Sequence, residues 1–297
     1  MATSTVAISI FLTVSAPKDV DWPVSPLEIV TGGKASDDQK ALKAMLQTRH
    51  VACAFGPTIS PNFVERLNAF AEVLNRSFPR LSVTIDYVDD ISNCRSGTTL
   101  FIDVQDGPVS RRELQSAYAN FGKVTGLQFD TSDPALYVSS FAQVFSLSVR
   151  QGRNIQIYGM MLLNQNSDQW ENGYSSYFSG LVAEEWFQFL TLLEDIDVDR
   201  FPRSIVEEKF IPTPELWQGR FDPDEIARLS DQNPVGLCML DIQILQEIYG
   251  SPMATYRDAS GYLSPEEVTL SIWQDFDSRG FADRRCATPM QQPEQQP

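Results

Sequence analysis

Two adjacent acids and an amide in one predicted helix are the residues of this sequence best placed to do chemistry. Glu184 and Gln188 are four residues apart, so their side chains share a helix face, and Glu185 lies next to that face. The same spacing occurs in the His-Glu-x-x-His zinc helix, where two histidines bind the metal and the glutamate between them activates water. Here the ligand positions are Glu and Gln, and the chain has one histidine, His50. A two-histidine zinc site is therefore excluded.

The helix that must position these residues is predicted over Gly180–Asp195. Its apolar residues recur with the spacing of one buried helix face: Val182, Trp186, Phe189, Leu190 and Leu193. The polar residues of interest lie on the remaining faces. The sequence therefore predicts a helix that packs against a core along one side and presents a glutamate and a glutamine along another.

Three short segments resemble an uncharacterised bacterial domain family in which a zincin-like helix has EExxQ in place of HExxH. They are the helix itself, Arg203-Ser204-Ile205-Val206, and the run from Asp241 to Tyr249. The similarity spans roughly residues 154 to 253. This chain departs from the family pattern in having Thr191 for Gly, Glu194 for Asn and Val206 for Phe. Without the glycine, the sharp turn after the helix is not assured.

The resemblance implies an α+β fold of zincin-like (metallopeptidase-like) type, with a small mixed sheet packed on helices and a degenerate metal site. It also implies an exported bacterial protein. The residue patterns also indicate both helices and strands. In some segments the apolar residues recur with helical spacing, and in others they occupy alternate positions, as in a strand. Helices are expected over 37–47, 60–78, 108–121, 235–249 and 264–276, and strands over 51–55, 81–88, 98–104, 141–149 and 154–163.

The expected organisation is one large domain with two distinct ends. Residues 1–50 form an N-terminal segment, residues 51–286 the zincin-like domain, and residues 287–297 a Pro/Gln-rich tail too polar to fold. Residues 6–16 have two interpretations. Their length and small final residues are typical of a signal-peptide core, whereas the strict alternation of apolar residues is typical of a half-buried strand.

Composition narrows the choice of partners. The formal net charge is -16, and an acidic surface repels phosphate backbones and anionic lipid heads. No apolar run approaches the ~20 residues that span a bilayer. We therefore expect no nucleic acid and no membrane insertion, and a neutral or cationic protein or peptide as the unknown partner. No phosphate loop, dinucleotide fingerprint or Gly-x-Ser-x-Gly elbow is present, so no cofactor is expected.

Four widely spaced cysteines leave the redox compartment open. Cys53, Cys94, Cys238 and Cys286 allow three pairings into two disulfides in an oxidising compartment, or four buried thiols in a cytoplasmic one. We expect a periplasmic or secreted protein, with the cytoplasm as the alternative.

A partial calcium loop lies near the C-terminus. Asp258, Ser260 and Glu267 occupy positions three, five and twelve of an EF-hand loop, but position one is Tyr256. The same residues have a simpler interpretation, in which Glu267 belongs to the first turn of a helix capped by Ser264. An acidic run at Asp195, Asp197 and Asp199 lacks the required glycine and glutamate, so we expect a solvated helix exit there.

Two functions are consistent with these observations. The first is a non-catalytic, zincin-like binding or structural module, a pseudoenzyme in which Glu184, Glu185 and Gln188 line a polar cleft or bond to the core. The second is an atypical hydrolase that uses Glu184 or Glu185 with no zinc or with another metal, Glu185 being the general base. His50 has no Asp, Glu or Cys as an adjacent residue, so we expect a side chain at a strand edge rather than a ligand.

Overall fold

The fold was analysed in a computed structural model of the chain. It describes residues 7–8, 48–106, 111–126, 142–151, 154–165, 177–193, 204–205, 236–250, 257–258, 261–262 and 264–286. The predicted helix over 37–47, the acidic run at 195–199 and the tail at 287–297 lie outside these ranges. Among the residues described, no helix is both long enough and apolar enough to cross a membrane.

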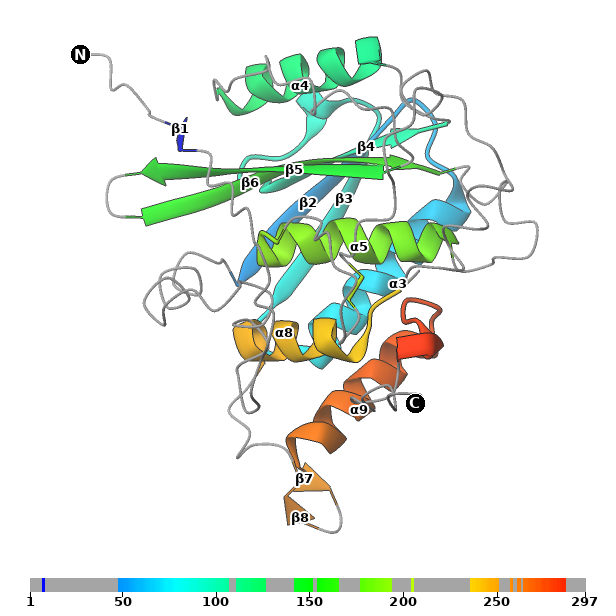
Figure 1. The fold of residues 1–297 in the computed structure, drawn as a ribbon. Helices are drawn as coiled ribbons and strands as arrows, with labels where there is room; N and C mark the ends of the chain where they lie inside the picture. The colour runs from blue at the N-terminus through cyan, green and yellow to red at the C-terminus, as the bar shows by residue number, and fades with distance from the viewer. Residues whose placement is uncertain are drawn as a thin grey trace, which may run out of the picture.

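A six-stranded mixed sheet forms the centre of the fold, with the strand order β1-β5-β6-β4-β2-β3. Strands β6, β4, β2 and β3 are mutually parallel, β5 runs antiparallel to β6, and β1 runs antiparallel to β5. The strands are β1 Ala7–Ile8, β2 Arg49–Phe55, β3 Ser82–Val88, β4 Leu100–Gln105, β5 Ala142–Gln151 and β6 Asn154–Asn164. A short hairpin, β7 Arg257–Asp258 with β8 Gly261–Tyr262, lies apart from this sheet (Figure 1).

Helices cover both faces of the sheet. In Figure 1, α4 lies above the sheet, whereas α3, α5 and α8 lie below it and α9 packs beneath α8 and α3. The helices are α3 Pro61–Ser77, α4 Arg111–Thr125, α5 Tyr177–Thr191, α8 Met239–Tyr249 and α9 Pro265–Asp277, with 3-10 turns η1 Ile91–Asn93 and η5 Arg284–Cys286. The predicted combination of helices with a small mixed sheet is confirmed.

Each face of the sheet has its own hydrophobic cluster, because side chains alternate along a strand. On β6, Met161 and Leu163 belong to the larger cluster under α3, α5, α8 and α9. Met160 and Leu162 belong to the smaller cluster under α4. Met160 is fully buried in that smaller cluster.

The helix boundaries follow their capping residues. Ser60 caps α3 by accepting a hydrogen bond from the Phe63 N–H at 3.2 Å, and Pro61 occupies the first turn, as the sequence predicted. The helix predicted from residue 235 begins instead at Met239. Leu237 is extended and forms a parallel bridge with Ala282, so the chain is in a strand-like conformation there.

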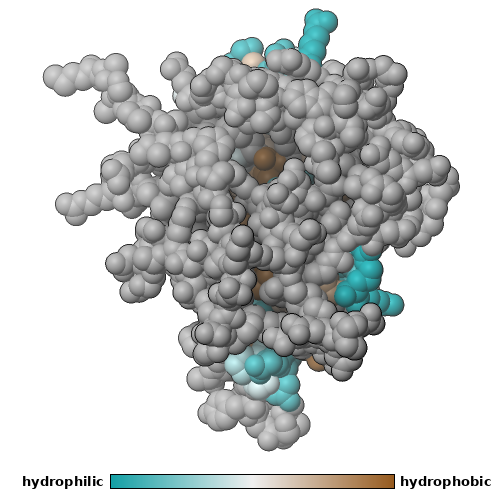
Figure 2. Space-filling view, in the orientation of Figure 1, coloured by the Kyte–Doolittle hydropathy of each residue, from teal (hydrophilic) through white to brown (hydrophobic). Residues whose placement is uncertain are grey.

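On the face seen in Figure 2, hydrophilic side chains of the described residues protrude at the surface, whereas hydrophobic ones are visible only in recesses between other atoms. Most large apolar side chains are accordingly inside. Among the described residues only Val124 and Leu270 are large, apolar and exposed, and both lie on helices, one at the end of α4 and the other in α9. Two scattered residues of this kind do not form a patch.

Close contact between β6 and α5 depends on one glycine. A Cβ atom added to Gly159 would lie 2.6 Å from Phe189 Cδ2 and 2.9 Å from Leu100 Cδ1. These separations are far below van der Waals contact, so the aromatic ring occupies the space that a side chain would need. The absent side chain sets how closely α5 approaches the sheet.

Replacing Gly159 by Ala is therefore expected to destabilise the protein by about 1–3 kcal/mol through overpacking. The measurement is the denaturant midpoint of unfolding followed by tryptophan fluorescence. Ser116→Ala, on the exposed face of α4, is the control and should change stability by no more than about 0.5 kcal/mol. Equal stability of the two variants would show that α5 can move away from the sheet at no cost.

Candidate functional site

The central helix α5 is held by aromatic contacts on its buried side. The Trp186 ring lies 6.3 Å from Phe70 of α3 and 6.2 Å from Phe189, measured between ring centroids. At the start of the helix, Arg66 of α3 donates a hydrogen bond to the Ser179 hydroxyl at 2.9 Å. The apolar residues predicted to be buried are buried, but burial is not confined to one side of the helix. Among residues 179–193, only Gln188 and Leu192 are partly exposed.

Glu184 and Glu185 are both buried in the middle of α5. Their exposed fractions are 8% and 6%, and Gln188, one turn on from Glu184, is partly exposed. Burial of a carboxylate is costly unless donors, a cation or a proton compensate it. Two adjacent acids are rarely buried together, so this turn of α5 is the strongest candidate site among the sequence-predicted residues.

His50 is buried beside the same helix. It lies near the start of β2, an internal strand, and is 2% exposed, so it is buried rather than placed at a strand edge. Its ring packs edge-on against Phe189 of α5, with a centroid distance of 5.1 Å. The one imidazole of the chain therefore belongs to the packing between the sheet and α5.

A sharp turn ends α5 despite the missing glycine. Leu192 has a φ of 57°, the left-handed conformation that glycine adopts most easily. The Thr191 hydroxyl donates to the Phe187 carbonyl at 2.7 Å, and the Leu193 N–H donates to the Thr191 Oγ1 at 3.3 Å. The threonine at the usual glycine position thus bonds locally to stabilise the turn. The helix ends at residue 191, earlier than the predicted Asp195.

The two other sequence segments singled out above meet at one buried carboxylate. Asp241, which is fully buried, accepts hydrogen bonds from the Ser204 hydroxyl at 2.5 Å, the Ile205 N–H at 2.9 Å and the Cys238 N–H at 2.7 Å. Three donors compensate one buried charge, which is the arrangement such a group requires. Residues separated by 36 positions in sequence are joined in this way.

The same helix reaches α5. At the end of α8, the Tyr249 hydroxyl donates to the Leu190 carbonyl at 2.7 Å, and burial raises the pKa of this phenol well above its usual value. The Leu190 carbonyl belongs to the last turn of α5, where helix carbonyls lack partners in the helix. Asp241 and Tyr249 therefore fix the two ends of α8, one to residues 204–205 and the other to α5.

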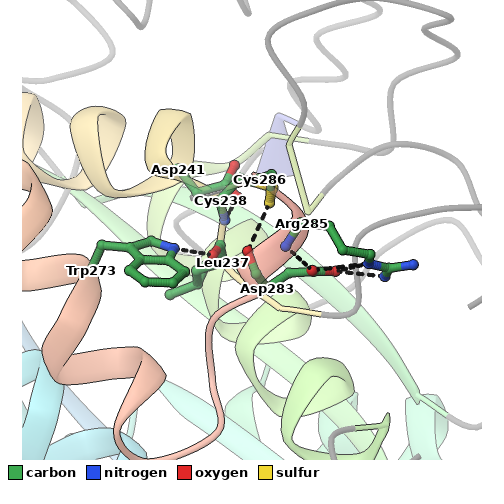
Figure 3. Close-up of polar contacts among 7 residues, drawn as sticks. All are labelled: Leu237, Cys238, Asp241, Trp273, Asp283, Arg285 and Cys286. Carbon is green, nitrogen blue, oxygen red and sulfur yellow. Dashed lines mark hydrogen bonds and ion pairs between the residues drawn. A yellow bond between two sulfur atoms is a disulfide. The ribbon is translucent and has the colours of Figure 1, made fainter. Parts of the chain in front are cut away.

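All four cysteines are paired, as Cys53–Cys94 and Cys238–Cys286. Of the three pairings that the sequence left open, the structure has this one. Figure 3 shows the second disulfide beside Leu237, whose carbonyl accepts a hydrogen bond from Trp273 Nε1 at 3.0 Å. The disulfide thus ties the start of α8 to the end of the described chain.

An ion pair between a buried aspartate and an exposed arginine lies at the same corner. Asp283, 5% exposed, accepts from Arg285 Nη2 at 2.6 Å and from Arg285 Nε at 3.0 Å (Figure 3). The Asp283 N–H donates to the Leu237 carbonyl at 3.2 Å, and the Cys286 N–H donates to the Asp283 carbonyl at 3.1 Å. These contacts hold the segment after α9 in place and give this corner a structural role.

The partial calcium loop has a capping role at Glu267. Its carboxylate accepts from the Ser264 N–H at 2.7 Å, while Ser264 Oγ accepts from the Glu267 N–H at 3.2 Å, a reciprocal capping box at the start of α9. Asp258 ends the two-residue strand β7, and Ser260 lies outside the described ranges. Within those ranges, no group of three or more His, Cys, Asp or Glu residues is arranged to hold a metal.

A second polar region, which the sequence reasoning missed, lies at the carboxyl ends of the parallel strands. The Gln165 amide accepts from the Ser60 N–H at 2.7 Å and donates to the Thr58 carbonyl at 2.8 Å and to Asp106 Oδ1 at 2.5 Å. Helix α3 follows β2 below the sheet and α4 follows β4 above it, so β2 and β4 flank a topological switch point (Figure 1). Polar residues directly after buried strands were the available signal.

Asp103 of β4 is the group near this region whose pKa is clearly shifted. Burial raises its pKa to about 6, a hydrogen bond donated by Gln105 opposes the rise, and the Glu113 carboxylate of α4 adds to it. The Gln105 Nε2 lies 2.5 Å from Asp103 Oδ1. A carboxyl that titrates near neutrality can exchange protons with a ligand, which makes this a second candidate region.

No protein-family model matches the sequence, and no curated protein matches it. The likeness to the EExxQ family therefore rests on the short segments described above. Two of those segments, Ser204-Ile205 and the helix that begins near Asp241, are in direct contact. Their contact gives a physical reason for their occurrence together in one sequence.

Ser204→Ala is expected to lower the free energy of unfolding by about 1.5–3 kcal/mol, because it removes a hydrogen bond to a buried charged group. The measurement is urea-induced unfolding followed by circular dichroism. Ser278→Ala, which removes an exposed hydroxyl bonded to the Asp275 carbonyl, is the control and should change stability by no more than about 0.5 kcal/mol. Similar losses in both variants would argue against a special role for the buried carboxylate of Asp241.

Asp103 predicts a pH dependence with a definite sign. Because its folded-state pKa lies above the ordinary 3.8, the folded protein holds this proton more tightly, so the contribution to stability is present below about pH 4 and is lost as pH rises through about 6. Asp103→Asn should lack this loss. We expect the variant to gain stability relative to the native protein between pH 4 and 7 in denaturant titrations. If the difference in stability between Asp103→Asn and the native protein stayed constant from pH 4 to 7, the raised pKa of Asp103 would be contradicted.

Proposed function

We propose that this protein is an exported, zincin-like module that acts by binding rather than by zinc catalysis. The observation that carries the proposal is the burial of Glu184 and Glu185 on the helix that follows the mixed sheet. Gln188 on the same helix is partly exposed, so one polar side chain of the set is accessible from outside. A partner that contacts Gln188 would lie next to the two acids.

The donor set argues against a zincin-type metal. Zinc prefers imidazole and thiolate ligands. All four cysteines are in disulfides, and the one histidine packs against Phe189. The residues at the ligand positions, Glu184 and Gln188, supply a carboxylate and a neutral amide. This set does not fit zinc, so no catalytic step through zinc is derived.

Export is supported by cysteine usage. Two disulfides that use every cysteine of the chain are typical of proteins in oxidising compartments. We therefore propose a periplasmic or secreted location. A signal-peptide interpretation of segment 6–16 would agree with this location, whereas the pairing of Ala7–Ile8 with β5 favours the other interpretation, a strand of the sheet.

The class of partner follows from charge. With a net charge of -16, the surface favours a neutral or cationic protein or peptide and disfavours nucleic acid. An electrostatic contribution to such binding is weakened by salt because exposed charges are screened. Association that persists unchanged in high salt would point to apolar contacts instead.

The same burial favours a second candidate, a hydrolase in which Glu185 is a general base. A buried carboxylate next to a reacting water can accept its proton. Glu184 and Glu185 are sequence neighbours and point about 100° apart on a helix, so they do not form the facing pair of a glycosidase. A hydrolase of this kind would therefore have to use Glu185 as its one general base.

One experiment separates the two candidates. The untagged protein is purified from the periplasm or medium, its metal content is measured by elemental analysis, and hydrolysis of a peptide library is assayed. The Glu184→Ala, Gln188→Ala double variant and Glu185→Gln are compared with Glu65→Gln, an exposed acid on α3. We expect metal well below one ion per chain and no turnover that Glu185→Gln abolishes.

Two results would overturn the binding-module proposal. Near-stoichiometric metal that is lost only in the double variant would establish a metal site with unusual ligands. Turnover lost in Glu185→Gln but retained in Glu65→Gln, with both variants folded by circular dichroism, would establish the hydrolase.

A further inference from the structure

The two outer edges of the parallel–antiparallel sheet differ in how they are protected. An edge strand presents unpaired N–H and C=O groups that can pair with another chain, and proteins usually block such edges. At one side of the sheet the outermost long strand is β3, and at the other it is β5, which β1 covers in part. The comparison of β3 with β5 identifies the edge that is open.

The edge of β3 is blocked by a side chain. Because the Ser82 N–H bonds to the Thr48 carbonyl on the β2 side, the polar groups of Val83 point outward. The Asn75 amide bonds to both of them, accepting from the Val83 N–H at 2.7 Å and donating to the Val83 carbonyl at 2.9 Å. The side chain thus takes the place that a further strand would occupy.

Among the described residues, none blocks the edge of β5 in the way that Asn75 blocks β3. The strand has ten residues, AQVFSLSVRQ, with no proline, no glycine and one charged residue, Arg150. Only Ser148 and Val149 pair with β1, so within the described parts of the chain the other eight of the ten have no strand on the outer side. A long edge with a single charged residue and no proline is the type of edge that accepts an added strand.

The pairing of β1 with β5 indicates what kind of strand can bind to this edge. Strand β1 is antiparallel to β5, with Ala7 opposite Val149 and Ile8 opposite Ser148. Further along β5, Ala142 and Val144 are partly buried against the core cluster on the α5 face of the sheet. A strand that extended this pairing would place every second side chain beside these apolar residues, so it needs apolar residues at alternate positions.

We propose that the outer edge of β5 is a binding site for an extended peptide segment with apolar residues at alternate positions, which joins the sheet as an antiparallel strand. This inference rests on the proposed binding function and names its surface and its class of partner. The antiparallel contact with β1 lies next to the site, and the acidic surface of the chain favours a neutral or basic segment.

The test uses the full chain and a synthetic peptide. The probe has the alternating sequence of residues 5–14, TVAISIFLTV, with lysines at both ends for solubility. A peptide of the same composition, reordered so that the alternation is lost, is the control probe. Affinity is measured by fluorescence anisotropy, and the bound region by hydrogen exchange with mass spectrometry. We expect the probe to bind at least tenfold more tightly than the control and to slow exchange within residues 142–147.

Charged substitutions at each edge locate the site. Ser146→Lys places a charge in β5 opposite the basic probe and should weaken binding at least tenfold. Thr84→Lys, an exposed position on β3, should leave binding unchanged. The proposal would be overturned if the two peptides bound equally well or if hydrogen exchange slowed only outside β5. It would also be overturned if Thr84→Lys weakened binding of the probe more than Ser146→Lys.

Failure here is distinguishable from failure of the binding module. If the probe does not bind while metal and turnover remain absent, the β5 site is wrong and the general function is untouched. Stoichiometric metal or Glu185-dependent turnover would instead contradict the module, whatever the peptide result.

Discussion

The buried carboxylate of Asp241 is the interaction on which the arrangement of the helices below the sheet depends. It compensates its own desolvation by accepting three hydrogen bonds, and those donors come from the start of α8 and from residues 204–205. Losing any one of these donors would leave the buried charge incompletely compensated, which costs free energy. The carboxylate therefore holds the two segments that supply the donors together. Through Tyr249 at the far end of α8, this constraint extends to the last turn of α5 and so to the orientation of Glu184 and Glu185.

Much of the fold could be predicted from local patterns. The Ser60 and Pro61 signal located the start of α3, Ser264 and Pro265 that of α9, and alternating apolar residues located β3, β5 and β6. These signals are local, since caps and alternation depend on neighbours in sequence. The boundaries of α5 and α8 were less accurate because they depend on distant contacts. Leu237 is extended because it pairs with Ala282, 45 residues later, which no local pattern indicates.

The candidate site was predicted in part. The spacing of Glu184, Glu185 and Gln188 placed them on one helix, but their burial could not be read from the sequence, because it depends on what packs over that turn. The disulfide pairing depends in the same way on which strands and turns meet in space. Asp103 and Gln165 were missed because their significance comes from the sheet order. Asp103 lies in β4 and Gln165 directly follows β6, and these strand ends come together only because β2, β4 and β6 are neighbours in the sheet.

The two disulfides divide the chain into mechanically different parts. Cys53–Cys94 closes a loop that contains α3 and β3, and Cys238–Cys286 closes one that contains α8, the β7–β8 hairpin and α9, with sequence separations of 41 and 48. When the protein is pulled from its two ends, tension passes through each disulfide and bypasses the enclosed loop. The load then falls on residues 1–52, 95–237 and 287–297, and the middle one of these segments contains β4, α4, β5, β6 and α5. The helix that carries the buried acids is therefore in the extensible part of the molecule, and its partner helix α8 is in a part that force cannot extend.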